Sequence, residues 1–158
     1  MKRSVPYFLV VGVLLVLDQA SKSWVAAKIG LFQTVRVIPG FFNLTHVRNK
    51  GAIFGVFNHV PGHTVALFLT GLSVLAFILV LVYFFKTPPQ QTLTRFTLAL
   101  IMAGALGNQI DRIVRGTVVD FLEIHVRHFY WPTFNLADAC VSVGAVLLIY
   151  IFLVRRTA

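Results

Sequence analysis

The stretch VALFLTGLSVLAFILVLVYFF, from Val65 to Phe85, is 21 residues long and carries no charged side chain. An α-helix of about 20 apolar residues is long enough to cross the hydrocarbon core of a bilayer. Apolar runs of about 10–14 residues are more typical of core helices in soluble proteins. The stretch therefore predicts a membrane-spanning helix, and it places the whole chain among membrane proteins.

The composition of the chain agrees with this interpretation. Its 158 residues, short enough for one domain, are 58% hydrophobic and only 12% charged, with a mean hydropathy of +0.83. The formal charge of +9 comes from 14 lysines and arginines scattered along the chain, so we expect anionic lipid headgroups rather than nucleic acid as their partner. The single cysteine, Cys140, excludes an internal disulfide and a cysteine-based metal cluster.

Three other apolar stretches predict further membrane spans, at about residues 6–25, 93–115 and 136–154. Pro88 and Pro89 separate the span 65–85 from the third one, because paired prolines cannot continue a helix, and Gly116 ends the third span. The sequence thus predicts an all-α membrane protein with four transmembrane helices in one domain, residues 1–158. An even number of spans places both termini on one side. The basic residues are almost evenly divided between the two sides, and we favour termini inside.

Between the first two spans, residues 29–62 predict a small hairpin outside the membrane. The segment TVRVIPGFFNLTHVRN (34–49) is rich in β-branched and aromatic residues around a Pro-Gly turn. A second short strand is expected at residues 122–127, where apolar and polar side chains alternate. The aromatic residues 129–131 then have the composition of a membrane-interface belt.

Ionisable residues within predicted spans are costly to bury and therefore suggest a function. Asp18 and Lys22 lie one helical turn apart and can pair; we favour a structural ion pair over a catalytic role. The third span carries a polar stripe that must face protein or water rather than lipid. Its members are Gly104, Asn108, Asp111, Arg112 and Arg115.

Asp120 and Asp138 belong to a chain with only five acidic residues, and both are predicted at the membrane surface where the third and fourth spans meet. Asn135 has the residue type of a helix N-cap, with Asp138 three residues later. Asp120 has no evident partner among its apolar neighbours. Two close carboxylates share a proton near neutral pH, so one can activate water while the other protonates a carbonyl oxygen. This aspartic-protease chemistry, a proton or cation pathway and a structural role all remain open at this point.

Other chemistries have weaker support in the sequence. His125 and His128 are two potential metal ligands, too few for a site, and we interpret them as surface histidines. Cys140 would point away from Asp138 on a helix, which favours a packing role over a nucleophile. We therefore expect neither a metal nor a cofactor.

Five short motifs resemble the signature blocks of the lipoprotein signal peptidases (signal peptidase II). They are DQASK (18–22), RNKGAIFG (48–55), GALGNQIDR (104–112), VVDF (118–121) and FNLAD (134–138), in the order in which that family has them. The resemblance covers nearly the whole chain. It implies an intramembrane aspartic endopeptidase that cuts prolipoproteins before a diacylglyceryl-modified cysteine, with Asp120 and Asp138 as the catalytic pair.

The resemblance also implies roles for other residues and a location. It assigns substrate binding or positioning to Asn49, Gly51, Asn108, Arg112 and Asn135, and structural support to Asp18, Lys22 and Asp111. It implies cytoplasmic termini in a bacterial inner membrane, a periplasmic β-cradle at about residues 31–59 and an active site near the periplasmic surface. The implied partners are a prolipoprotein with diacylglyceryl-cysteine and membrane lipid, and we expect a monomer.

Two other classes of function compete with a peptidase. A small transporter or channel would need polar residues deep in the bundle, but only Thr70 and Ser73 are polar in the middle of the second span. A structural subunit of a larger complex would show no activity after purification. If the two aspartates do form a dyad, a helix N-terminus favours the charge on Asp138 and burial favours the neutral acid at Asp120.

Overall fold

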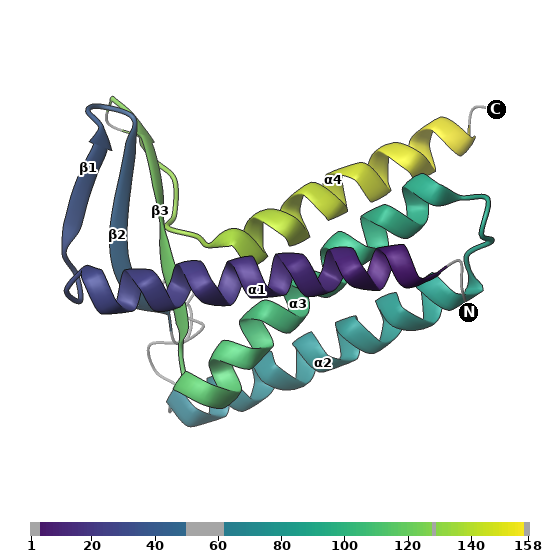
Figure 1. Ribbon diagram of the computed structural model, residues 1–158, viewed down its shortest axis with the longest axis horizontal. Helices are drawn as coiled ribbons and strands as arrows, with labels where there is room; N and C mark the ends of the chain where they lie inside the picture. The colour runs from purple at the N-terminus through teal and green to yellow at the C-terminus, as the bar shows by residue number, and fades with distance from the viewer. Residues whose placement is uncertain (1–3, 50–61, 128, 157–158) are drawn as a thin grey trace.

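The computed structural model describes residues 4–49, 62–127 and 129–156 and consists of four helices and a small sheet (Figure 1). The helices are α1 (Val5–Lys28), α2 (Gly62–Lys86), α3 (Thr92–Arg115) and α4 (Leu136–Arg156). All four stretches that were predicted to be helical are helical, with ends within a few residues of the predicted ones. Gly116 follows α3 with a φ of 70°, the left-handed conformation that glycine adopts without strain. The predicted end of the third helix is thus confirmed.

The strands form one antiparallel sheet in the order β1-β2-β3-β4. They are β1 (Thr34–Ile38), β2 (Phe42–Asn49), β3 (Val118–Val126) and β4 (Phe129–Tyr130). The hairpin of β1 and β2 was predicted, and its turn contains Gly40 with a φ of 77°. The predicted class, all-α with a small hairpin, was too narrow. Residues 118–126 form a longer strand than expected, and this strand pairs with β2.

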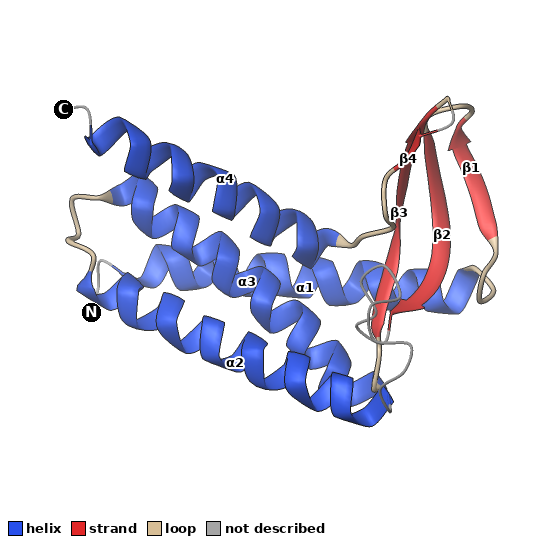
Figure 2. Ribbon diagram, turned by 180° about the vertical axis from the view of Figure 1, so that it is seen from behind, coloured by secondary structure: helices blue, strands red, loops and turns tan. Residues whose placement is uncertain are grey.

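The sheet lies at one end of the helix bundle, and both chain termini lie at the other end (Figures 1 and 2). Helix α3 packs against each of the other three helices. One buried cluster, which includes Val11, Phe84, Leu98 and Met102, joins α1, α2 and α3. A second cluster joins the end of α1 to β3 through Val25, Ile29, Val119 and Phe121. The sheet is therefore fixed to the bundle close to the end of α3.

Two of the helical segments, Val5–Lys28 and Leu136–Val154, are long and apolar enough to cross a membrane. A shorter apolar stretch, Thr70–Lys86, lies in α2. Helix α3 is more polar, and its buried residues include Thr94, Arg95 and Asp111. By length and composition, two of the four predicted spans meet this criterion within the described ranges, and the four-span arrangement stays a prediction.

The close contact between α3 and α4 generates a prediction about stability. A Cβ atom added at Gly104 would collide with the backbone carbonyl oxygen of Ala137 and would lie 2.6 Å from a methyl carbon of Val141. Overpacking of this kind typically costs about 1–3 kcal/mol. We expect Gly104→Ala to lower the melting temperature of the purified protein in detergent.

Gly12 offers a matched control, because a Cβ added there meets no atom within 4 Å. Alanine in the middle of a helix is favoured over glycine by roughly 0.5–1 kcal/mol. Gly12→Ala should therefore leave the melting temperature unchanged or raise it. Equal destabilisation by the two substitutions would show that the α3–α4 contact is looser than described.

Candidate active site

Asp120 lies on β3, opposite Val47 of β2, and only 3% of its surface is exposed. Its two oxygens accept hydrogen bonds from two amide side chains, Asn49 Nδ2 at 3.0 Å and Asn135 Nδ2 at 2.7 Å. These two asparagines are the partners that were not evident among the sequence neighbours of Asp120. Both donors come from other segments of the chain, so the residues next to Asp120 in the sequence gave no sign of them.

Asp138 lies in the first turn of α4, where its carboxylate and Asn135 cap the helix reciprocally. The backbone N–H of Asp138 donates to Asn135 Oδ1 at 2.9 Å, and the backbone N–H of Asn135 donates to Asp138 Oδ2 at 3.2 Å. This is the capping-box arrangement predicted from the sequence. The Asp138 side chain remains half-buried, so it is accessible while Asp120 is enclosed.

Two asparagines link the two carboxylates. Asn135 Nδ2, which donates to Asp120, also donates to Asn108 Oδ1 at 3.2 Å. Asn108 Nδ2 in turn donates to Asp138 Oδ1 at 2.7 Å. The structure thus brings Asn49, Asn108 and Asn135 together with both aspartates, and the roles that the family resemblance implies for them stay predictions.

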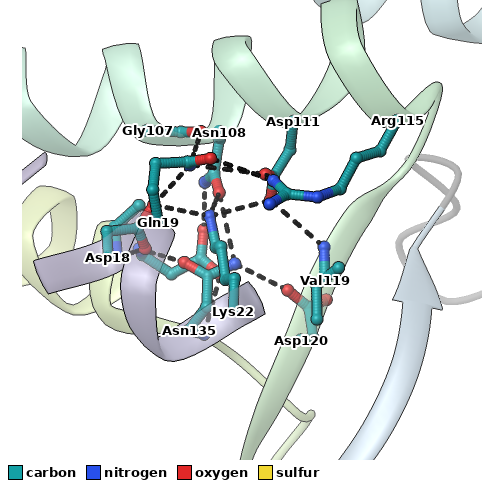
Figure 3. A network of polar contacts seen from close by, with 12 residues as sticks. Asp18, Gln19, Lys22, Gly107, Asn108, Asp111, Arg115, Val119, Asp120 and Asn135 are labelled. Atoms are coloured by element: carbon teal, nitrogen blue, oxygen red, sulfur yellow. Dashed lines mark hydrogen bonds and ion pairs between the residues drawn. The ribbon is translucent and has the colours of Figure 1, made fainter. Parts of the chain in front are cut away.

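Lys22 reaches Asn108 from α1 and is fully buried (Figure 3). Its ammonium group contacts Asp18 Oδ2 at 2.8 Å, Asp111 Oδ2 at 3.0 Å and Asn108 Oδ1 at 3.0 Å. The predicted ion pair between Asp18 and Lys22 is present, but Asp111 is a second counter-ion from another helix. A buried cation between two buried carboxylates avoids the large cost of an unpaired charge.

Asp18, through its other oxygen, and Asp111, through the same Oδ2 that contacts Lys22, also accept hydrogen bonds from backbone N–H groups next to the candidate dyad. Asp18 Oδ1 accepts from the Ala137 N–H at 2.9 Å, and Asp111 Oδ2 accepts from the Val119 N–H at 3.3 Å. Ala137 directly precedes Asp138, and Val119 directly precedes Asp120. The charged groups on α1 and α3 therefore fix the backbone that carries each aspartate.

Arg115 and Gln19 extend the network beyond Asp111 (Figure 3). Arg115 forms an ion pair with Asp111 and donates to Gln19 Oε1 at 2.9 Å. Gln19 Nε2 donates to the carbonyl oxygen of Gly107 at 3.0 Å. Gln19 was not among the predicted site residues, although it lies within the DQASK motif.

A cavity of about 300 Å³ opens beside the carboxylate of Asp138, between α2, α3 and α4. Its lining combines small apolar and polar residues: Ser73, Ala76, Ile101, Gly104, Ala105, Asn108, Arg112, Asp138, Val141 and Ser142. Arg112 Nη1 donates to Ser73 Oγ at 3.4 Å. Within the described part of the chain, Arg112 forms no ion pair with Asp120 or Asp138 and contributes its charge to the cavity wall.

Burial has a direct effect on the protonation of Asp120. Loss of hydration raises the pKa of Asp120 to about 6; the hydrogen bonds from Asn49 and Asn135 oppose this rise, and the charge of Asp138 adds to it. A carboxyl group with a pKa of about 6 keeps a fraction of its protons near neutral pH and can donate them. Next to a second, more accessible carboxylate, it provides the components of acid–base catalysis on a carbonyl group.

Three other predicted residues, Gly51, His125 and His128, have a different outcome. Gly51 lies outside the described residues, as do His128 and most of the RNKGAIFG motif. His125 was predicted on the surface, but it is only 8% exposed and stacks on Tyr130 with ring centroids 4.9 Å apart. The pairing of β3 with β4, which places Tyr130 opposite His125, is the reason for this burial.

Comparisons with known proteins show which family the chain is similar to. A family model for signal peptidase (SPase) II matches residues 10–154 of the chain. The lipoprotein signal peptidase of Syntrophus aciditrophicus (strain SB) is 40% identical over 150 residues, which are 94% of this chain and 93% of that protein. The lipoprotein signal peptidase of Yersinia pseudotuberculosis serotype O:1b is 41% identical over 138 residues, 87% of this chain and 80% of that protein.

A solved structure extends the similarity to the fold. A bacterial membrane enzyme, determined by the in meso method at 2.3 Å resolution, has a TM-score of 0.82 and 31% sequence identity. The match covers 97% of this chain and 90% of that one. The chain therefore belongs to the signal peptidase II family, whose members are aspartic peptidases that remove signal peptides from prolipoproteins.

Proposed function

We propose that the protein is an aspartic endopeptidase that cuts prolipoproteins directly before a diacylglyceryl-modified cysteine, and that Asp120 and Asp138 are its catalytic residues. The observation that carries this assignment is the pair of carboxylates joined through Asn135 and Asn108 beside a cavity between the helices. Asp120 is buried and has a raised pKa, whereas Asp138 is half-buried at a helix N-terminus. Asp120 is therefore suited to act as the acid, and Asp138 is suited to act as the base.

The cleavage step follows from this difference. Asp138 accepts a proton from water as the hydroxyl adds to the scissile carbonyl carbon, while Asp120 donates its proton to the carbonyl oxygen. The tetrahedral intermediate then collapses, the C–N bond breaks, and the leaving nitrogen takes the proton from Asp138 as Asp120 recovers its own. Neither a metal nor a covalent intermediate is needed, and the dyad returns to its starting state.

In this proposal all four helices cross the bacterial inner membrane, with cytoplasmic termini and the sheet on the periplasmic side. The position of the sheet and of both aspartates at the end of the bundle opposite to the termini supports it (Figure 1). Large apolar side chains cover outward faces of α1 and α4; Val16 is 67% exposed and Val146 is 66% exposed. Such faces are compatible with lipid rather than water.

The substrate would enter the cavity beside Asp138 with its lipid in the surrounding bilayer. Arg112, on the cavity wall, has its charge available for substrate carbonyl oxygens, and Asn49 and Asn135 hold Asp120 in place. Gly51 is assigned to substrate positioning by its place in the family motif alone. We propose that the enzyme acts as a monomer, because both aspartates and their partners come from one chain.

Conservative substitution of either aspartate tests the dyad. Asp120→Asn and Asp138→Asn should each abolish cleavage of a diacylglyceryl-modified prolipoprotein, because asparagine can neither take up nor return the proton. The double variant should be no worse than either single one, since the two groups act as a unit. Cleavage is read as a gel shift, and the melting temperature reports folding. Near-normal turnover by either single variant would refute the assignment.

The raised pKa of Asp120 predicts a pH dependence. Asp120 is neutral below its pKa of about 6 and ionised above it, and the mechanism needs the neutral form. The value of kcat/KM, which reports the free enzyme, should therefore fall as the pH rises through an apparent pKa near 6. Return to lower pH should restore activity, and a flat profile between pH 5 and 8.5 would contradict the proposed acid.

The lipid on the substrate should contribute to turnover. Binding energy from acyl chains can position a scissile bond that lies some distance from them. We expect a prolipoprotein without the diacylglyceryl group to be cut much more slowly than the same protein with it, at equal concentrations in the same detergent. Equal rates for the two substrates would argue for an intramembrane protease with a broader substrate class.

A further inference from the structure

The surroundings of Lys22 contain one contact that charge compensation does not explain. An ammonium group has three N–H bonds, and here they meet two carboxylates and the uncharged Oδ1 of Asn108. Asp18 and Asp111 already exceed the charge of Lys22 alone, and Arg115 balances the remainder. The third contact therefore has its main effect on Asn108 rather than on the charge of Lys22.

Asn108 is held in one of the two orientations that a side-chain amide can take. Its Oδ1 accepts from Lys22 at 3.0 Å and from Asn135 at 3.2 Å, and its Nδ2 donates to Asp138 at 2.7 Å. A 180° flip would turn the NH₂ group towards two donors and the oxygen towards a carboxylate. Every one of these contacts would become repulsive, so the orientation depends on the two donors at Oδ1 together with the carboxylate at Nδ2.

We propose that Lys22 is a positioning residue for the cleavage reaction, because its ammonium group holds the Asn108 amide with the N–H towards Asp138. The inference rests on the proposed function of Asp120 and Asp138. In this arrangement one oxygen of Asp138 is held by Asn108 and the other by the backbone N–H of Asn135. The carboxylate cannot rotate, and its free lone pairs keep a fixed direction towards the cavity.

The test must separate this effect from a loss of folding. Removal of Lys22 alone would leave Asp18 and Asp111 with only Arg115 as a counter-charge. Asp18→Asn restores the balance, and its remaining side-chain oxygen can still accept from the Ala137 N–H, which is 2.9 Å away. Lys22→Met is therefore made in the Asp18→Asn background as well as in the unmodified chain.

A double-mutant cycle between Lys22→Met and Asn108→Ala gives the decisive comparison. We expect Lys22→Met to lower the single-turnover cleavage rate by roughly 100-fold, the scale of a small misplacement of a catalytic group, with KM unchanged. In the Asn108→Ala background the same substitution should cause little further loss. If Lys22→Met lowers the rate by the same factor in both backgrounds, Lys22 does not act through Asn108 and the inference is wrong.

Lys22→Gln provides a second variant that keeps an N–H donor without the charge. Gln and Met have the same side-chain length and remove the same charge, so they should destabilise the fold similarly. Only Gln can donate to Asn108 Oδ1, and we expect it to be at least tenfold faster than Met. Equal rates for Lys22→Gln and Lys22→Met would overturn the inference even if both variants are less stable.

Arg95 supplies the matched control for the loss of a buried cation. It is 5% exposed near the start of α3, at the other end of the bundle, where its guanidinium lies 4.8 Å from the centroid of the Phe84 ring. Arg95→Met should lower the melting temperature without changing the cleavage rate. A loss of rate equal to that of Lys22→Met would mean that reduced stability explains both.

The outcomes also separate this inference from the proposed function. If Asp120→Asn or Asp138→Asn still cleaves the substrate, the assignment of the dyad is wrong, whatever the result for Lys22→Met. If both aspartate variants are inactive and the cycle shows no coupling, the dyad stands and only the role of Lys22 fails.

Discussion

The buried ammonium group of Lys22 imposes a constraint on most of the molecule. A charge removed from water needs every hydrogen-bonding partner that it can obtain, because an uncompensated buried ion costs several kcal/mol. For Lys22 these partners lie on its own helix, at Asp18, and on α3, at Asn108 and Asp111. The same two carboxylates hold the backbone in front of Asp138 and of Asp120. Charge compensation within the bundle thereby sets where both aspartates can lie.

Close helix packing makes this network possible. A Cβ atom at Gly107 would lie 2.6 Å from Asp18 Oδ2, so the approach of α1 to α3 at the ion pair requires a residue without a side chain. Gly104, one turn earlier, allows α4 to reach the same face of α3. The glycines of the motif GALGNQIDR therefore allow the helices to approach closely enough for the polar residues that follow them to interact. The ion pairs between α1 and α3 form only because the backbones of the two helices lie close together.

Local features of the sequence predicted most of the secondary structure and the helix cap that holds Asp138. Length and apolarity predicted the helices, the Pro-Gly turn predicted the first hairpin, and FNLAD predicted the cap that holds Asp138. Long-range pairing could not be read in this way. The donors of Asp120 lie 71 and 15 residues away in the chain, and β3 finds its partner in β2. The burial of His125 was missed for the same reason, since no local pattern indicates which strand will cover a side chain.

The distribution of the site over the chain has a consequence for biosynthesis. Asp120 is made with Asn49, Asn108 and Lys22 already in the nascent polypeptide, but its second amide donor and the second carboxylate both belong to residues 135–138. Until that segment has emerged and α4 has docked on α3, the proposed dyad is incomplete and cannot activate water towards a peptide bond. The proposed proteolytic centre is therefore inactive until α4 has folded, so folding provides the protection that other proteases obtain from a removable pro-segment.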